Sequence, residues 1–181
     1  MNRQQRRQQA HKSRRREGQP PGDTTLERRL DDALRLHQRG EFERAEAIYR
    51  NVLRQQPDHA DALHLLGVLR HQCGASEEAR ELLERALENL PSSPETLYNL
   101  ADILLAQGKP TEAIARFQSA LSQRPDFAEA RISLGVAYRA AGEMEKAINQ
   151  LREATEKHPD YAEAHYNLGD TLRIQNDVAG A

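Results

Sequence analysis

Residues 60–93 read ADALHLLGVLRHQCGASEEARELLERALENLPSS, and this stretch of 34 residues decides the fold. Its layout returns in residues 94–127 and again in residues 128–161. Three residue types keep the same 34-residue step: Gly40, Gly74, Gly108 and Gly142; Ala45, Ala79, Ala113 and Ala147; Pro57, Pro91, Pro125 and Pro159. A phase-locked period of this length is typical of a repeat array.

Each unit is predicted to contain two amphipathic helices joined by a turn. Apolar residues recur with helical spacing before Gly74, and again from Ala79 to Leu90. Gly74 can take the positive φ that ends a helix, and Pro91 stops the second helix. In the next unit, Pro110 suits the first turn of the second helix. The sequence therefore predicts an all-α chain.

Small residues in the first helices indicate close contact with the second helices. They are Gly67, Ala101, Gly135 and Gly169. We expect each to let the partner helix approach, with a small residue such as Ala113 facing it. A large side chain at Gly135 or Ala113 is then expected to overpack the pair and cost about 1–3 kcal/mol.

The composition excludes several classes of protein. The 181 residues are 38% apolar and 4% aromatic, which suits one helical domain. Cys73 is the single cysteine and cannot form an internal disulfide, so we expect a reducing compartment, the cytoplasm. No apolar stretch approaches the roughly 20 residues that span a membrane, and the N-terminus lacks a secretory signal.

Residues 1–22 form a basic arm. They carry a net charge of +6, whereas the rest of the chain carries −8. The arm has no Leu, Ile, Val, Phe, Tyr or Trp, so we expect it to be disordered. It is a candidate for weak, salt-sensitive contact with nucleic acid or an anionic surface; a solubilising tail is the alternative. Thr24 and Glu27 then predict a capping box at the first helix.

The repeated pattern resembles the tetratricopeptide repeat (TPR) family. The matching residues are Leu66, Gly67, Gly74, Ala79, Leu83, Ala86 and Pro91 in one unit; Leu100, Ala101, Leu104, Gly108, Ala113, Phe117, Ala120 and Pro125 in the next; and Leu134, Gly135, Tyr138, Gly142, Ala147, Leu151, Ala154 and Pro159 in the third. The resemblance implies a right-handed α-solenoid of antiparallel helix pairs, a TPR superhelix of about four and a half repeats.

We expect the units to fall at 1–22 (arm), 23–59 (degenerate first TPR), 60–93, 94–127, 128–161 and 162–181 (truncated TPR). In the degenerate unit, Asp32 and Ala33 replace the usual Leu-Gly pair. The last unit is expected to stop at Ala181, partway into its second helix. The chain is then a fragment of a longer protein, or a partner covers its end; a frayed final helix is the alternative. An uncovered apolar end also favours self-association.

By resemblance to TPR proteins, the first helices line a concave groove that holds extended peptides. The expected groove residues are His64, His71, Tyr98, Asn99, Asp102, Arg139, Tyr166, Asn167, Asp170 and Arg173. Asn99 and Asn167 lie two units apart, and an amide matches both groups of a peptide unit. Leu65 and Ser133 interrupt this ladder. The alternative is that both asparagines only hydrogen-bond neighbouring helices.

Other kinds of site find little support in the sequence. His59, His64, His71 and Cys73 lie close in sequence, but about 10 Å of helix separates His64 from His71, too far for one metal ion. The basic residues that clamp a carboxylate in chaperone adaptors are absent from the corresponding positions. No phosphate-binding loop or nucleophile elbow occurs, and glutamates such as Glu78 are expected on solvated helix faces. We expect no cofactor and no catalytic residue in this segment.

Two functions stay open. The first is a scaffold that binds a peptide or partner protein in the groove. The second is the substrate-recruiting N-terminal region of a longer enzyme, with its catalytic domain beyond residue 181. A glycosyltransferase of the O-linked N-acetylglucosamine type is the expected example. Tyr98-Asn99-Leu100-Ala101 and Tyr166-Asn167-Leu168-Gly169 resemble motifs in its TPR units.

Overall fold

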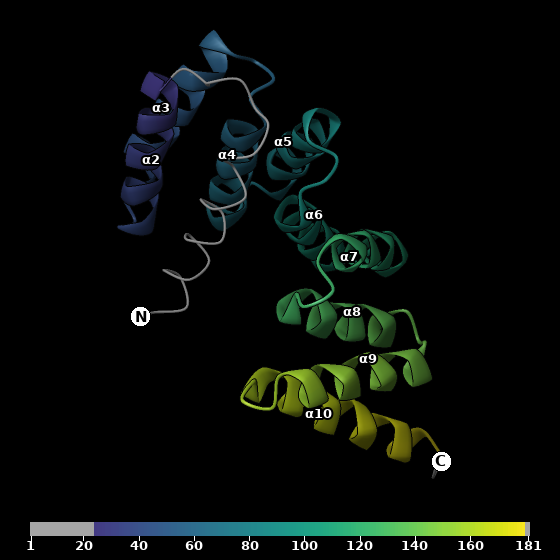
Figure 1. Cartoon of the computed structure of the whole chain (residues 1–181). Coiled ribbons are helices and arrows are strands. Elements are labelled where there is room, and N and C mark those ends of the chain that lie inside the picture. The colour runs from purple at the N-terminus through teal and green to yellow at the C-terminus, as the bar shows by residue number, and fades with distance from the viewer. Residues whose placement is uncertain (1–23, 180–181) are drawn as a thin grey trace.

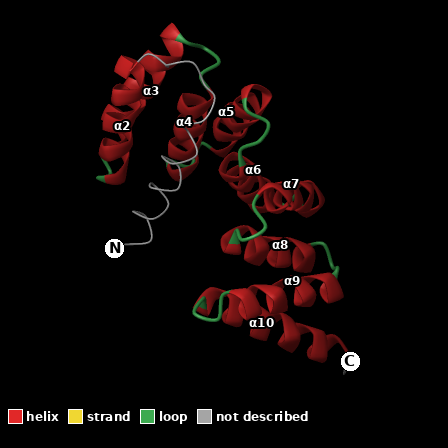
Figure 2. Cartoon of the chain, in the orientation of Figure 1, coloured by secondary structure: helices red, strands yellow, loops and turns green. Residues whose placement is uncertain are grey.

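The computed structural model describes residues 24–179, and this part of the chain is a curved row of antiparallel helix pairs (Figure 1). Short loops join the helices, and no strand occurs in this range (Figure 2). The helices are α2 (Thr24–Gln38), α3 (Phe42–Gln55), α4 (Ala60–Gln72), α5 (Ser76–Asn89), α6 (Pro94–Ala106), α7 (Pro110–Gln123), α8 (Ala128–Ala140), α9 (Met144–Lys157) and α10 (Ala162–Ala179). The predicted all-α solenoid is confirmed. The basic arm, residues 1–22, lies outside the described residues, so its disorder and its contacts stay predictions.

The repeated glycines and prolines end the helices, as predicted. Gly40, Gly74, Gly108 and Gly142 have φ of 79°, 82°, 72° and 78° in the turns inside each pair. Other residues rarely adopt this left-handed conformation. Leu90, which precedes Pro91, has φ −138° and ψ 79°, outside the helical region. Pro110 begins α7, where its missing N–H costs nothing.

Close helix contact is confirmed at two of the small residues. A Cβ atom added to Gly67 would lie 2.9 Å from Leu83 Cγ, and one added to Gly135 would lie 2.6 Å from Leu151 Cγ. At Gly169 the prediction is wrong, because no atom lies within 4 Å of the added Cβ. In the described chain no second helix packs over this face of α10.

The last helix also differs from the sequence-based expectation. α10 is one continuous helix from Ala162 to Ala179, so the chain does not turn into a second helix within the described residues. Asn176 stands 34 residues after Gly142, at the position where the other units place their turn glycine. Without glycine at this position, the helix continues past the point where the earlier units reverse direction.

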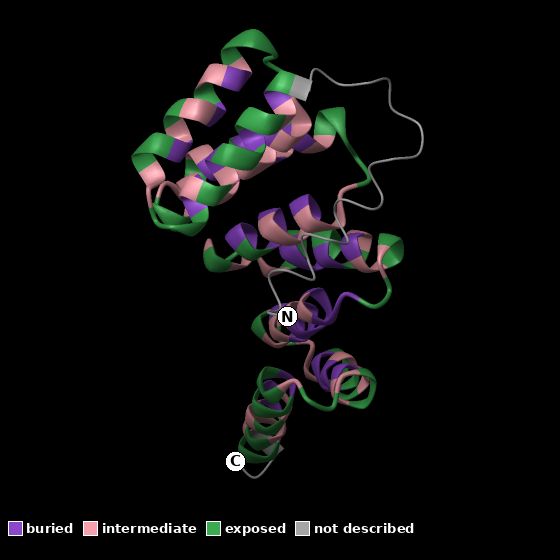
Figure 3. Ribbon diagram, turned by 60° about the vertical axis from the view of Figure 1, so that its left-hand side comes forward, coloured by how far each residue is buried: buried purple, intermediate pink, exposed green. Residues whose placement is uncertain are grey.

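Buried residues lie where the helices face one another, and exposed residues cover the outside (Figure 3). The degenerate first unit packs in the same way, because Leu30, Ala33 and Tyr49 are buried between α2 and α3. The backbones of consecutive first helices (α2, α4, α6, α8, α10) come within 8 Å of one another, whereas those of consecutive second helices (α3, α5, α7, α9) do not. The array therefore curves with the first helices on its inside. We call the surface along these five helices the inner face.

Candidate functional site

Side chains of the inner face link one first helix to the next. His64 Nδ1 on α4 lies 2.8 Å from Thr96 Oγ1 on α6. The side chain of Ser133 on α8 lies beside the Tyr98 phenol on α6. Arg139 on α8 donates to Asp170 on α10. These contacts join α4 to α6, α6 to α8 and α8 to α10. Thr96 is a member that the sequence interpretation did not include.

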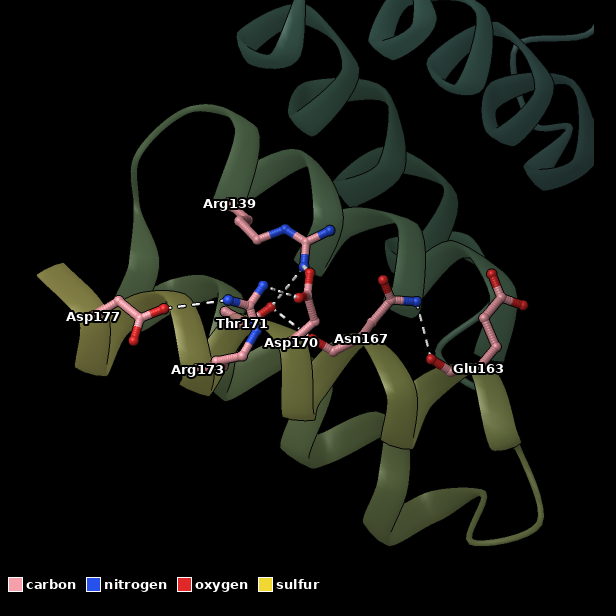
Figure 4. A network of polar contacts seen from close by, with 7 residues as sticks. All are labelled: Arg139, Glu163, Asn167, Asp170, Thr171, Arg173 and Asp177. Carbon is pink, nitrogen blue, oxygen red and sulfur yellow. Dashed lines mark hydrogen bonds and ion pairs between the residues drawn. The ribbon is translucent and has the colours of Figure 1, made fainter.

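Three of the predicted groove residues meet near α10 (Figure 4). Arg139 Nη1 donates to Asp170 Oδ2 at 2.8 Å and to Thr171 Oγ1 at 3.2 Å. Arg173 Nη2 donates to Asp170 Oδ1 at 2.9 Å, so two guanidinium groups share one carboxylate. Asn167 lies one turn before this cluster on α10 (Figure 4). The arrangement neutralises Asp170 within the protein.

The two asparagines differ in their surroundings. Asn167 is 9% exposed, and its Nδ2 donates to the Glu163 carbonyl oxygen of its own helix at 2.9 Å. Asn99 is half-buried, and no hydrogen bond joins its side chain to another described residue. Of the pair, Asn99 therefore has the amide that a ligand can engage without breaking an existing bond.

The two predicted tyrosines are also in different environments. The ring of Tyr98 lies 5.9 Å from that of Phe117 and 5.1 Å from that of Phe127. Burial raises the pKa of the Tyr98 phenol, and the nearby Asp102 carboxylate raises it further. Tyr166 is 74% exposed, because no second helix packs after α10 in the described chain. Tyr98 is thus a packing residue with a polar edge, whereas Tyr166 is a surface residue.

The histidines of α4 take part in local contacts. His71 Nδ1 lies 3.3 Å from Ser76 Oγ, and His71 Nε2 lies 3.9 Å from Asp102 Oδ2. His59 Nδ1 accepts a weak bond from the Ala62 backbone N–H at 3.5 Å. Residues 24–179 hold no group of three His, Cys, Asp or Glu side chains that could bind a metal ion.

The structure corrects the interpretation of Glu78 as a solvated glutamate. Its carboxylate lies 2.8 Å from Arg50 of α3 and 2.7 Å from Arg70 of α4. Both arginines also pair with Glu46, at 2.8 Å and 3.2 Å. The hydrogen bond from Arg50, with that from Arg70, lowers the pKa of Glu78 although burial opposes this. The sequence shows only that residues of opposite charge occur in neighbouring units, and this does not specify which of them form ion pairs.

No helix in the described range is long and apolar enough to cross a membrane.

Comparison with known proteins gives a family and several related structures. The family model described as "Tetratricopeptide repeat" matches residues 36–103 and 104–169. The crystal structure of the MamA protein superposes with a TM-score of 0.75 at 24% identity, over 84% of this chain and 83% of that chain. At this identity the likeness shows the fold alone. No curated protein sequence matches the chain.

Two further structures have slightly higher identity. YrrB, described as a TPR protein with an unusual peptide-binding site, has a TM-score of 0.72 at 27% identity, over 82% of this chain and 76% of that one. A mutant of the O-GlcNAc transferase of Thermobaculum terrenum has a TM-score of 0.71 at 28% identity. The match covers 78% of this chain but 28% of the transferase.

Proposed function

The chain belongs to the tetratricopeptide repeat family, and on that premise we propose that it is a protein–protein interaction scaffold that binds an extended peptide or partner protein on its inner face. The repeat fold is typically a non-catalytic scaffold. The proposed compartment is the cytoplasm, which rests on the single, exposed Cys73.

One observation carries this proposal: side-chain bonds join neighbouring first helices across the inner face, yet the face leaves hydrogen-bonding groups open to a ligand. Asn99 and Asp102 lie on the same side of α6, and neither is fully buried. The cross-helix bonds of His64 and Arg139 hold the neighbouring first helices in place. Binding to such a preorganised surface costs little ordering of the protein. YrrB, which shares the fold, is described as having a peptide-binding site.

The proposal is tested by removing the asparagine amides. The probe is the tightest peptide recovered from a random peptide display library by selection on the full chain. Changing both Asn99 and Asn167 to Ala is expected to weaken its binding about tenfold, with most of the loss from Asn99→Ala. Asn149→Ala, an exposed asparagine of α9, is the matched control. Unchanged affinity of a folded double variant would contradict the assignment.

The second candidate function is the substrate-recruiting region of an O-GlcNAc-type glycosyltransferase. The likeness to the Thermobaculum terrenum enzyme supports it: 78% of this chain matches 28% of that protein. The test is to express the complete reading frame and to assay its product for transfer of N-acetylglucosamine from the nucleotide sugar. Transfer would support the enzyme. A complete reading frame that encodes no nucleotide-sugar site would favour the scaffold instead.

A further inference from the structure

From α4 to α10, one register of the inner face alternates between aliphatic and acidic side chains. These inner-stripe residues follow one another at 34-residue steps on α2, α4, α6, α8 and α10: Leu34, Val68, Asp102, Val136 and Asp170. The valines therefore lie on α4 and α8, with an aspartate on the first helix that separates them. From Val68 onward, like residues lie two units apart.

The two valines are open to solvent in part. Val68 lies one turn before His71 on α4, and Val136 lies one turn before Arg139 on α8. His71 contacts Asp102 on α6, and Arg139 contacts Asp170 on α10, so both side chains lie on the inner face. Each valine, one turn away, lies on the same side of its helix. Both valines are partly exposed, and among the described residues neither joins an apolar core cluster. Each thus presents part of an aliphatic side chain to solvent.

The two aspartates differ although they occupy the same register. Asp170 accepts from Arg139 at 2.8 Å and from Arg173 at 2.9 Å, and its side chain is 27% exposed. Asp102 is 51% exposed, and its cationic neighbour is His71 at 3.9 Å. A histidine is a cation only when protonated. Asp102 is therefore the inner-stripe carboxylate that can accept a cation from outside the chain.

The spacing of the helices sets the length of a matching ligand. Packed helices lie about 8–10 Å apart, so two steps from α4 to α8 span about 20 Å. An extended peptide in the polyproline II conformation advances about 3.1 Å per residue with three residues per turn, so about six residues cover this span, and the first, middle and last of them face the same side. A side chain midway between the ends then lies over α6, where Asp102 is placed.

We propose that the inner face selects an extended peptide with two aliphatic side chains about six residues apart and a lysine or arginine midway between them. The aliphatic side chains lie on Val68 and Val136, and the cation pairs with Asp102. This proposal rests on the proposed function and adds the chemical class of its ligand.

The first test reads the pattern from selection. A library of random 12-residue peptides is displayed and selected on the full chain. The expected result is enrichment of peptides with two aliphatic residues about six positions apart and a basic residue between them. Enriched peptides without this pattern would overturn the ligand class while leaving peptide binding intact. Absence of any enrichment would overturn both proposals.

The second test isolates the ion pair. The probe is a synthetic peptide with leucine at its third and ninth positions, lysine at its sixth, and serine or glycine elsewhere. Asp102→Asn is expected to weaken its binding about fivefold, but to leave unchanged the binding of the same peptide with glutamine in place of lysine. Asp126→Asn, an exposed loop aspartate, is the matched control. An equal loss for the lysine and glutamine peptides would overturn the pairing.

Discussion

Glycine has two separate roles among the residues of this array. In the turns, Gly74 and its equivalents supply positive φ, and space is not limiting there, since an added Cβ would touch nothing. Inside the first helices, Gly67 and Gly135 lack a side chain because a leucine of the second helix occupies that space. The first role follows from local sequence, whereas the second depends on a partner helix.

Gly135→Ala is therefore expected to destabilise the fold by about 1–3 kcal/mol, since its Cβ would lie 2.6 Å from Leu151 Cγ and 3.3 Å from the Ala147 carbonyl oxygen. Urea denaturation followed by circular dichroism measures this. Gly169→Ala is the control, where the open site should give a gain of about 0.5–1 kcal/mol from lower unfolded-chain entropy. Equal effects at the two glycines would refute the packing role.

Tyr98 and Tyr166 occupy equivalent positions of the repeat, but their environments differ, and the sequence did not predict this difference. Both stand in a Tyr-Asn-Leu motif, and the motif alone assigns them one role. Tyr98 packs against Phe117 and Phe127, which follow it in the next helix and loop. Tyr166 has no such helix after it among the described residues and is exposed. The environment of a repeat residue thus depends on the following unit.

At the scale of elements, helix limits were predictable because their causes are local. Glycine turns and the residues before proline set them within a few positions. Contacts between units were not predictable. Arg50 of α3 reaches Glu78 of α5, and Arg70 of α4 lies between them in sequence. Which charges meet depends on how each pair rotates against the next.

The Arg50–Glu78–Arg70 network predicts a specific pH dependence. The pKa of Glu78 is lowered in the folded chain, so its contribution to stability is present above the ordinary carboxyl pKa of about 4.3 and is lost as pH falls through the lowered value. Glu78→Gln should cost about 1 kcal/mol or less at neutral pH, since the side chain is 36% exposed, and nothing at pH 2.

Urea denaturation between pH 2 and pH 7 measures how the cost of Glu78→Gln in free energy of unfolding depends on pH. Glu81→Gln, at an exposed position of the same helix, is the control and should not change the profile. A loss from Glu78→Gln that is the same at pH 2 and pH 7 would show that the ion pairs are not its cause.

At the scale of the whole molecule, the curvature places the first helices inside and leaves one face of α10 uncovered. Tyr166 and Leu90 are the large apolar residues exposed in the described chain, at 74% and 43%. Tyr166 lies one turn from Gly169. At the positions equivalent to Gly169, Gly67 and Gly135 pack against the second helix of their unit. The repeat period predicted the array, but not that α10 would continue straight at Asn176.

The open face of α10 is expected to make the chain self-associate as its concentration rises. Sedimentation velocity at increasing concentration measures this. Tyr166→Lys should abolish the association, whereas Leu90→Lys, at the other exposed apolar residue, should not. Equal behaviour of the two variants would place the association elsewhere.

NMR of the valine methyl groups tests whether the ligand binds on the inner face. The chain has four valines: Val52, Val68, Val136 and Val178. Val52 is fully buried, and Val68 and Val136 lie on the inner face. Adding the display-selected peptide is predicted to shift the methyl signals of Val68 and Val136 and to leave that of Val52 unchanged. Binding without a shift at Val68 or Val136 would contradict the account.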